Sequence, residues 1–287
     1  MRGVGTSRAA ISVVNALPLG IGSAIGVEWP ARATVHTREG PPRTTILPRA
    51  ARTPLVRATI RRAMEKFGGR SPCAIRLLVS STIPSARGLK SSSAVSSSVA
   101  LAAARAFGQD PSPEEVAGLA AEVGRATGVS ATGAFDDALA GLLPGGVVTD
   151  NRSDRLLSKF CLEPGLGVAV WFPERRHPPS PDLLARFRRE RGLARTAADA
   201  VLDGDWTRAM EVNSSLVERV MGYRYGPLHA AVERAGAVAS GVSGLGPAFA
   251  AVAPTERLPA ILRRLPSTGR RRSLRVFTAS SRGGNAR

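Results

Sequence analysis

The sequence predicts an α+β fold arranged in two lobes. Strand-like runs of apolar, β-branched residues and helix-like runs follow one another without a regular βαβ alternation. The 287 residues suffice for two domains with cores of their own, and a composition of 43% hydrophobic and 22% charged residues is typical of a globular chain. We expect an N-terminal domain over residues 1–155 and a C-terminal domain over residues 156–287.

Local patterns predict the elements of the first half. Runs of apolar and β-branched residues predict strands at 9–16, 26–37, 74–81 and directly after a turn at 145–150. Between the first two strands we expect a glycine-rich turn at 17–26, and after the second a polar connection at 41–54. Apolar spacing and helix-start signals, the clearest being the Ser112-Pro113-Glu114-Glu115 cap, predict helices at 55–67, 95–107, 113–125 and 133–143.

The second half is predicted in the same way. Short apolar runs predict strands at 167–172, 237–240, 248–252 and 273–279. A proline- and charge-rich loop is expected at 173–181. Helical spacing predicts helices at 181–191, 197–202, 206–221, 228–235 and 255–265.

The charge balance has two interpretations. The chain has 40 basic and 22 acidic residues, a net charge of +18, and all basic residues except Lys66, Lys90 and Lys159 are arginines. A basic surface can bind nucleic acid, but the arginines are spread along the chain and only 5% of residues are aromatic, so stacking platforms are scarce. We favour a compositional origin, and interpret the arginine clusters at 186–191 and 270–275 as solvated faces.

Cysteine use and hydropathy bear on the compartment. Cys73 and Cys161 are far apart and form no CxxC pair, so we expect reduced thiols in a cytoplasmic protein. The N-terminus lacks the apolar stretch of a signal peptide, and no run of about 18 apolar residues predicts a membrane span. His36, His177 and His229 are not spaced like metal ligands, and we expect structural roles for them.

The most informative segment is residues 83–94, IPSARGLKSSSA, which leads into an alanine- and valine-rich helical run. The free N–H groups at a helix start, together with the positive end of the helix dipole, bind phosphate well. Serine hydroxyls can add donors or ligate a metal that accompanies the phosphate. Serines are also common helix caps, so the segment alone does not decide between the two roles.

Three further segments carry candidate functional residues. Residues 15–26, NALPLGIGSAIG, contain a GxG after a strand, but the glycine spacing does not fit a dinucleotide fingerprint. Residues 240–249, SGVSGLGPAF, form a second glycine turn. Residues 132–138, TGAFDDA, place Asp136 and Asp137 at a helix start, where the dipole favours acids and where one carboxylate can orient or deprotonate a hydroxyl or help to hold Mg²⁺.

Taken together, these segments resemble the GHMP kinase superfamily. The phosphate-loop pattern P-x-x-x-G-L-x-S-S matches Pro84, Gly88, Leu89, Ser91 and Ser92. The variant GLKSSSA, with TGAFDDA and GGVVTDN downstream, resembles the archaeal-type shikimate kinase branch, and the first segment is similar to the N-terminal motif of that branch. The SGLGP segment that begins at residue 243 matches the C-terminal glycine motif of the superfamily, so four motifs occur in a consistent order over residues 3–253.

The resemblance implies an N-terminal lobe like ribosomal protein S5 domain 2, a ferredoxin-like C-terminal lobe, and ATP with Mg²⁺ in the cleft between them. It implies Asp136, with Asp137 beside it, as the catalytic base, and Ser91 as a metal ligand, with Glu122 as a second candidate whose spacing is longer than expected. It implies acceptor contacts at Asn15, Thr132 and Gly244. The residues implied for ATP are Pro84, Ser85, Ala86, Arg87, Gly88, Leu89, Lys90, Ser91, Ser92, Ser93 and Ala94.

The implied activity is ATP-dependent phosphorylation of shikimate to shikimate 3-phosphate, a step of chorismate and aromatic amino-acid biosynthesis. The carboxylate of shikimate suits a bidentate arginine, but the sequence does not single one out. The alternatives are a GHMP kinase for another small alcohol such as homoserine, or a basic nucleic-acid-binding protein. We expect no nucleic-acid or membrane partner, and the sequence leaves the oligomeric state open.

Overall fold

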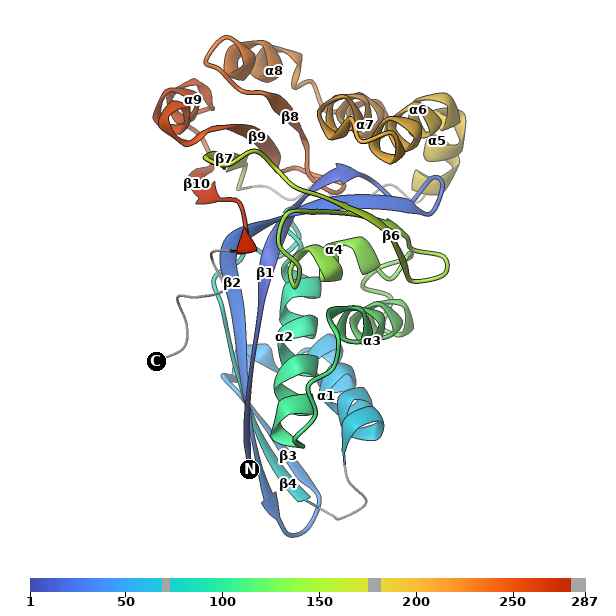
Figure 1. Cartoon of the computed structure of the whole chain (residues 1–287), viewed down its shortest axis with the longest axis vertical. Helices are drawn as coiled ribbons and strands as arrows, with labels where there is room; N and C mark the ends of the chain where they lie inside the picture. Colours follow the sequence, from blue (N-terminus) through green and yellow to red (C-terminus); the bar gives the residue numbers. More distant parts are fainter. Residues whose placement is uncertain (69–72, 175–181, 280–287) are drawn as a thin grey trace.

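Two separate β-sheets, one above the other, organise the chain (Figure 1). The computed structural model describes residues 1–68, 73–174 and 182–279. The larger sheet has the order β3-β4-β2-β5-β6, with β1 paired to β2. Its strands are β1 (Arg2–Val14), β2 (Ile21–Glu39), β3 (Arg43–Leu47), β4 (Cys73–Ser81), β5 (Gly146–Asp150) and β6 (Arg155–Phe160).

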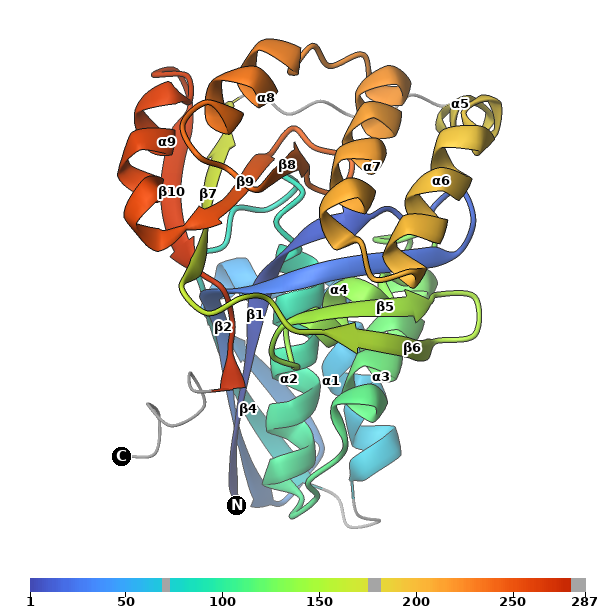
Figure 2. The same cartoon turned by 45° about the horizontal axis from the view of Figure 1, so that its top comes forward.

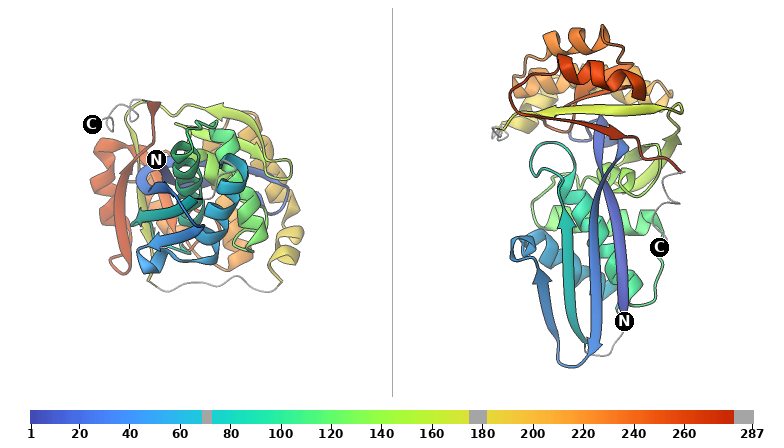
Figure 3. Two further views of the ribbon diagram at one scale, coloured as in Figure 1. Left: turned by 90° about the horizontal axis from the view of Figure 1, so that it is seen from below. Right: turned by 90° about the vertical axis from the view of Figure 1, so that its left-hand side faces the viewer.

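Four helices accompany the larger sheet. They are α1 (Pro54–Phe67), α2 (Ser91–Ala106), α3 (Pro113–Ala126) and α4 (Phe135–Ala140), with a short 3₁₀ turn, η1 (Arg49–Ala51), before α1. The side view in Figure 3 shows the helices on one face of the sheet. Apolar residues of α1, α2 and α3 join those of β2 and β4 in one buried cluster.

The smaller sheet is antiparallel throughout, in the order β10-β7-β9-β8. Its strands are β7 (Leu166–Phe172), β8 (Ala239–Val242), β9 (Phe249–Pro254) and β10 (Arg270–Arg275). The helices of this half are α5 (Leu183–Arg189), α6 (Arg191–Leu202), α7 (Trp206–Met221), α8 (Gly226–Glu233) and α9 (Leu258–Arg264), with the 3₁₀ turn η2 (Thr255–Arg257) before α9.

The β1–β2 hairpin joins the two halves. Its upper end extends beneath α6 and α7 (Figure 2). Val13, Val14 and Ile25 of the hairpin are buried in one cluster with Val170 of β7 and Met210 of α7. Because this core is continuous, loops from both halves are held at fixed positions around the top of the larger sheet.

Helix α2 lies at the centre of the larger half, and small residues allow it to approach β1 closely. Eleven of its sixteen residues are buried, and most of these are alanine or serine. On β1, a Cβ atom at Gly5 would overlap the carbonyl oxygen of Ser98, and one at Gly3 would overlap that of Ala102. The two glycines therefore set the distance between β1 and α2.

The structure confirms the α+β class. Several boundaries differ from the sequence expectations because pairing across the sheet overrides local signals. The expected turn at 17–26 ends at Gly20, since Ile21–Ile25 pair with β5. The polar connection at 41–54 contains β3, which pairs in parallel with β4. Helix α2 begins at Ser91 rather than at residue 95, and β10 begins at Arg270 rather than at residue 273.

Other differences lie in the second half. Strand β6 was not expected, because its side chains are mostly exposed and show no alternation. The helix expected at 181–191 is two helices, α5 and the start of α6, and α6 begins at Arg191 rather than at residue 197. Most of the loop expected at 173–181 lies outside the described residues, as do residue 181 and His177.

The larger sheet ends with Phe160 and the smaller begins with Leu166. The domain boundary between residues 155 and 156 stays a prediction. None of the helices in the described ranges combines the length and the apolar character that crossing a membrane requires.

The close approach of β1 to α2 can be tested with Gly5→Ala. The added methyl group meets backbone rather than a flexible side chain, so we expect the free energy of unfolding to fall by about 1–3 kcal/mol, measured by urea denaturation. Gly118→Ala in α3 is the matched control. A Cβ there meets nothing within 4 Å, and we expect a gain of about 0.5–1 kcal/mol from helix propensity. Equal effects of the two substitutions would contradict the close approach.

Candidate active site

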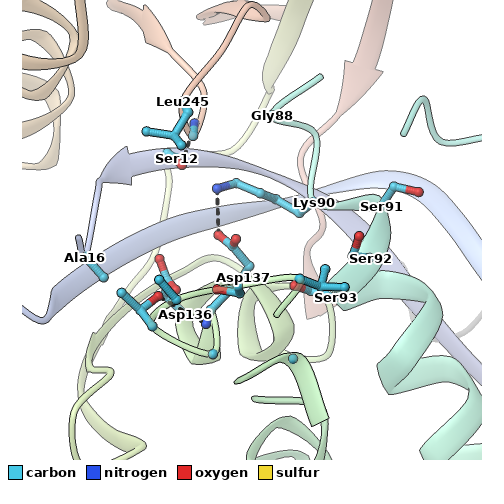
Figure 4. Close-up of a pocket in the computed structure, with 18 of the residues that line it drawn as sticks. Ser12, Ala16, Gly88, Lys90, Ser91, Ser92, Ser93, Asp136, Asp137 and Leu245 are labelled. Atoms are coloured by element: carbon cyan, nitrogen blue, oxygen red, sulfur yellow. Dashed lines mark hydrogen bonds and ion pairs between the residues drawn. The ribbon is translucent and has the colours of Figure 1, made fainter. Parts of the chain in front are cut away.

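The largest concentration of predicted site residues surrounds a cavity of about 500 Å³ between the two halves. Most of its lining comes from the end of β1 with the residues after it, the loop before α2 with the first turns of that helix, the segment 129–137 at the start of α4, and the glycine loop at 244–246. Figure 4 shows Lys90 extending to Asp137, with Ser91, Ser92 and Ser93 following Lys90 at the start of α2.

The loop before α2 turns sharply into the helix. Ala86, Gly88 and Lys90 all have a positive φ, and the αL residue Lys90 is the N-cap of α2 without a side-chain cap bond. The first N–H groups of a sixteen-residue helix are therefore left without a side-chain acceptor at the cavity wall. This arrangement suits an anion, and phosphate above all.

Three segments far apart in sequence are bonded together at this point. The Ser243 hydroxyl donates to the Gly88 carbonyl at 2.7 Å and accepts from the Ser12 N–H at 3.1 Å. The Ser12 hydroxyl in turn accepts from the Gly244 N–H at 2.9 Å. A Cβ at Gly88 would overlap the Ser243 carbonyl oxygen, so only glycine permits this contact. The glycine loop of the second half thus fixes the loop before α2.

Asn15 is part of the same junction. Its side chain donates to the Gly244 carbonyl at 3.3 Å and accepts from the Leu17 N–H at 2.9 Å, while its backbone N–H donates to Asn213 at 2.9 Å. Asn15 and Gly244 both line the cavity. These bonds show that Asn15 holds the loop after β1 against the glycine loop, a structural role the sequence did not indicate.

Lys90 and Asp137 form a buried ion pair. Lys90 Nζ lies 2.8 Å from Asp137 Oδ1, and each side chain is only about a tenth exposed (Figure 4). The pKa of the Asp137 carboxyl is raised to about 7, because burial and repulsion from Asp136 raise it more than the Lys90 ammonium lowers it. A carboxyl group that titrates near neutrality can accept a proton at physiological pH.

Asp136 has different surroundings. Its Oδ1 accepts from Asn151 Nδ2 at 2.7 Å, and Asn151 Oδ1 accepts from the Thr149 hydroxyl at 2.7 Å. A Cβ at Gly22 would lie 2.7 Å from Asp136 Oδ2, so the carboxylate also packs against the backbone of β2. Asp136 is thereby held rigidly by β2 and by the end of β5.

The structure brings most of the predicted site residues together. In addition to those described above, Thr132 and Leu89 line the cavity. Pro84, Ser85, Arg87 and Ala94 are not among its lining residues. The Ser91 hydroxyl donates to the Ile83 carbonyl at 3.2 Å.

Glu122 lies apart from the site. It is half exposed and pairs with Arg62 Nε at 2.7 Å. The described residues contain no group of three or more His, Cys, Asp or Glu side chains that could hold a metal. Sequence reasoning gave no role to Ser12, whose partners Ser243 and Gly244 are remote in sequence. It gave none to Asn151 either, although the motif GGVVTDN ends at that residue.

Comparison with known proteins agrees with this geometry. The model of the GHMP kinases N terminal domain matches residues 54–145. A shikimate kinase of Methanocella arvoryzae is 33% identical over 264 residues, which cover 89% of this chain and 86% of that protein. A shikimate kinase of Thermococcus kodakarensis is 34% identical over 250 residues, covering 86% and 90%. The chain belongs to the archaeal-type shikimate kinase family of GHMP kinases.

Solved structures show the same fold. The mevalonate kinase of Methanococcus jannaschii superposes with a TM-score of 0.74 at 12% identity, covering 97% of this chain and 99% of that one. The galactokinase of Lactococcus lactis complexed with galactose gives a TM-score of 0.74 at 12% identity, covering 96% and 94%. This member of the shikimate kinase family therefore has the GHMP kinase fold.

Proposed function

We propose that this protein transfers the γ-phosphoryl group of ATP to the 3-hydroxyl group of shikimate. The observation that carries the proposal is that the start of α2 and the Asp137–Lys90 pair line the same cavity. The relatives named shikimate kinase, matched over most of the chain, supply the acceptor. We also place the reaction in the cytoplasm, where ATP is available and free thiols such as Cys73 and Cys161 stay reduced.

The start of α2 is the proposed phosphate site. Its free N–H groups and dipole favour the anionic phosphates, and the Ser92 and Ser93 hydroxyls at the cavity wall add donors. Because the Gly88 backbone is bonded to Ser243, these donors are in place before the nucleotide arrives. Phosphoryl transfer depends mainly on such positioning and charge stabilisation.

Mg²⁺ is proposed to enter with ATP as part of the substrate. Magnesium commonly keeps several waters and phosphate oxygens and needs few ligands from the protein. Ser91 is the proposed protein ligand, because its hydroxyl donates to Ile83 and its oxygen keeps a lone pair for a cation. Bound Mg²⁺ would neutralise charge on the transferred group.

We assign the role of general base to Asp137 and that of orienting group to Asp136. The pKa of Asp137, about 7, suits proton transfer from the acceptor hydroxyl near neutral pH. Asp136 is held by Asn151, and its charge contributes to the raised pKa of its neighbour. The sequence had favoured Asp136 for the base.

Acceptor choice is tested by an ADP-release assay with shikimate, homoserine and mevalonate. We expect turnover with shikimate, at a kcat/KM far above that for the other two alcohols, because the relatives that match most of the chain are shikimate kinases. Preferred turnover of homoserine would replace the proposed substrate. Salt-sensitive binding to generic RNA without any kinase turnover would replace the proposed function.

The base assignment is tested with Asp137→Asn. Loss of the proton acceptor should lower kcat by about 10²–10⁴-fold while the KM for ATP changes little. In the wild type, kcat/KM for shikimate should rise with pH through about 7, because Asp137 acts when deprotonated.

Two neighbours should move this pH dependence in opposite directions. The Lys90 ammonium lowers the pKa of Asp137, so Lys90→Met should shift the acid limb to higher pH. The Asp136 carboxylate raises it, so Asp136→Asn should shift the limb to lower pH. Steady-state kinetics across pH 5–9 would measure both; an unmoved limb in both variants would rule out Asp137 as the titrating base.

The metal role of Ser91 is tested with Ser91→Ala at fixed ATP. We expect a higher Mg²⁺ concentration for half-maximal activity, because the proposed ligand oxygen is lost. Ser93→Ala, which alters the same cavity wall, is the control and should leave the Mg²⁺ dependence unchanged. The same Mg²⁺ dependence in wild type and Ser91→Ala would exclude Ser91 as a ligand.

A further inference from the structure

A second cavity adjoins the candidate active site. Its volume is about 600 Å³, and it is bounded by the loop at 16–20, by residues 131–132, by Asn151 and Arg152, and by Arg191. The two cavities share Ala16, Leu17, Ala131 and Thr132 in their walls. They are therefore neighbouring compartments of one depression.

A hydrogen bond links the second cavity to one of the paired aspartates of the first. Asn151 lines the second cavity, and its Nδ2 donates at 2.7 Å to Asp136 Oδ1, which lines the first. Arg125 supports the wall that the cavities share by donating to the Thr132 carbonyl at 3.2 Å. A molecule in the second cavity is thus separated from Asp136, the neighbour of the proposed base, by the side chain of Asn151.

One of the positively charged residues that line the second cavity has no acidic partner among the described residues. The lining of this cavity contains three arginines and no acid. Arg125 pairs with both Asp154 oxygens, at 2.9 and 2.5 Å, and Arg152 Nε pairs with Asp150 at 3.1 Å. Arg191 has no ion pair within residues 1–68, 73–174 and 182–279, so its guanidinium is the uncompensated charge of the lining.

The fold holds Arg191 at this position. It is the first residue of α6, and Leu193, two residues on, packs with Phe187 and with Leu17 and Leu19 of the loop that bounds the cavity. The neighbouring Glu190 lies 3.4 Å from Arg219 and so has a different cationic partner. The sequence placed Arg191 in a cluster expected to be merely solvated, whereas the fold brings it beside the active site.

We propose that Arg191 binds the carboxylate of the acceptor and that the second cavity holds this end of the molecule. The inference rests on the proposed function and names its specificity residue. A guanidinium binds a carboxylate through two parallel hydrogen bonds. The rigid ring of shikimate fixes its carboxylate relative to its 3-hydroxyl group, so anchoring the acid in the second cavity directs the hydroxyl toward Asp137.

The test combines a protein variant with an altered acceptor. Arg191→Gln removes the charge and keeps a polar side chain, and shikimate carboxamide removes the acceptor charge. Loss of a charge-assisted contact should lower the wild-type kcat/KM by about 10–100-fold for the carboxamide relative to shikimate. Arg191→Gln should lose a similar factor with shikimate but discriminate little between the two acceptors, with its KM for ATP unchanged.

Arg195→Gln is the matched control, because Arg195 is exposed one turn along the same helix and lines neither cavity. It should behave as the wild type, and Arg191→Lys should recover part of the discrimination. Undiminished discrimination in Arg191→Gln, or equal use of both acceptors by the wild type, would overturn the role of Arg191 and leave the kinase function standing. No wild-type turnover of shikimate would remove both.

Discussion

The packing of α2 against β1 is the constraint on which the rest of this structure depends. A helix of alanine and serine approaches a strand carrying Gly3 and Gly5 until their backbones touch, and the core of the larger half forms around that contact. Two buried serines of α2 find partners there: Ser96 meets the Thr59 hydroxyl at 2.9 Å, and the Ser98 hydroxyl donates to the Val95 carbonyl at 2.8 Å. Because the helix axis is fixed, its N-terminal donors are fixed too, and they face the cavity that the second half closes.

The candidate active site contains buried carboxyl groups, which destabilise a folded protein unless they are paired or hydrogen-bonded. Two adjacent aspartates are buried at the start of α4, and burial with mutual repulsion raises the pKa of one of them to about 7. The Lys90 ammonium offsets part of this cost, and Asn151 satisfies the other carboxylate. A perturbed carboxyl group beside helix-terminal donors is the environment expected of a catalytic site. Asp136 is held in this unfavourable position by its contact with β2 and by its bond to Asn151 after β5.

We propose different ligands for the two adjoining cavities. Kinases that share this fold at 12–13% identity include ones named for mevalonate and for galactose, so the fold by itself does not define an acceptor. The compartment at the start of α2 contains the features suited to a nucleotide phosphate. The adjoining one is bordered by the loop after β1, which carries no charge, and by Arg125, Arg152 and Arg191.

The order of strand-like and helix-like runs in the sequence was enough to predict the α+β class. The proposed phosphate loop, the aspartate pair and the family could be predicted because each depends on short segments with their own turn and capping chemistry. Only the tertiary structure decided which residues act together. Pairing with neighbouring strands makes 43–47 and 155–160 strands although their local signals are weak. Tertiary packing brings Lys90 to Asp137 and leaves Glu122 paired with Arg62 at the surface. Tertiary structure also places Arg191 in the wall of the second cavity with no ion pair among the described residues, which no local sequence pattern indicates.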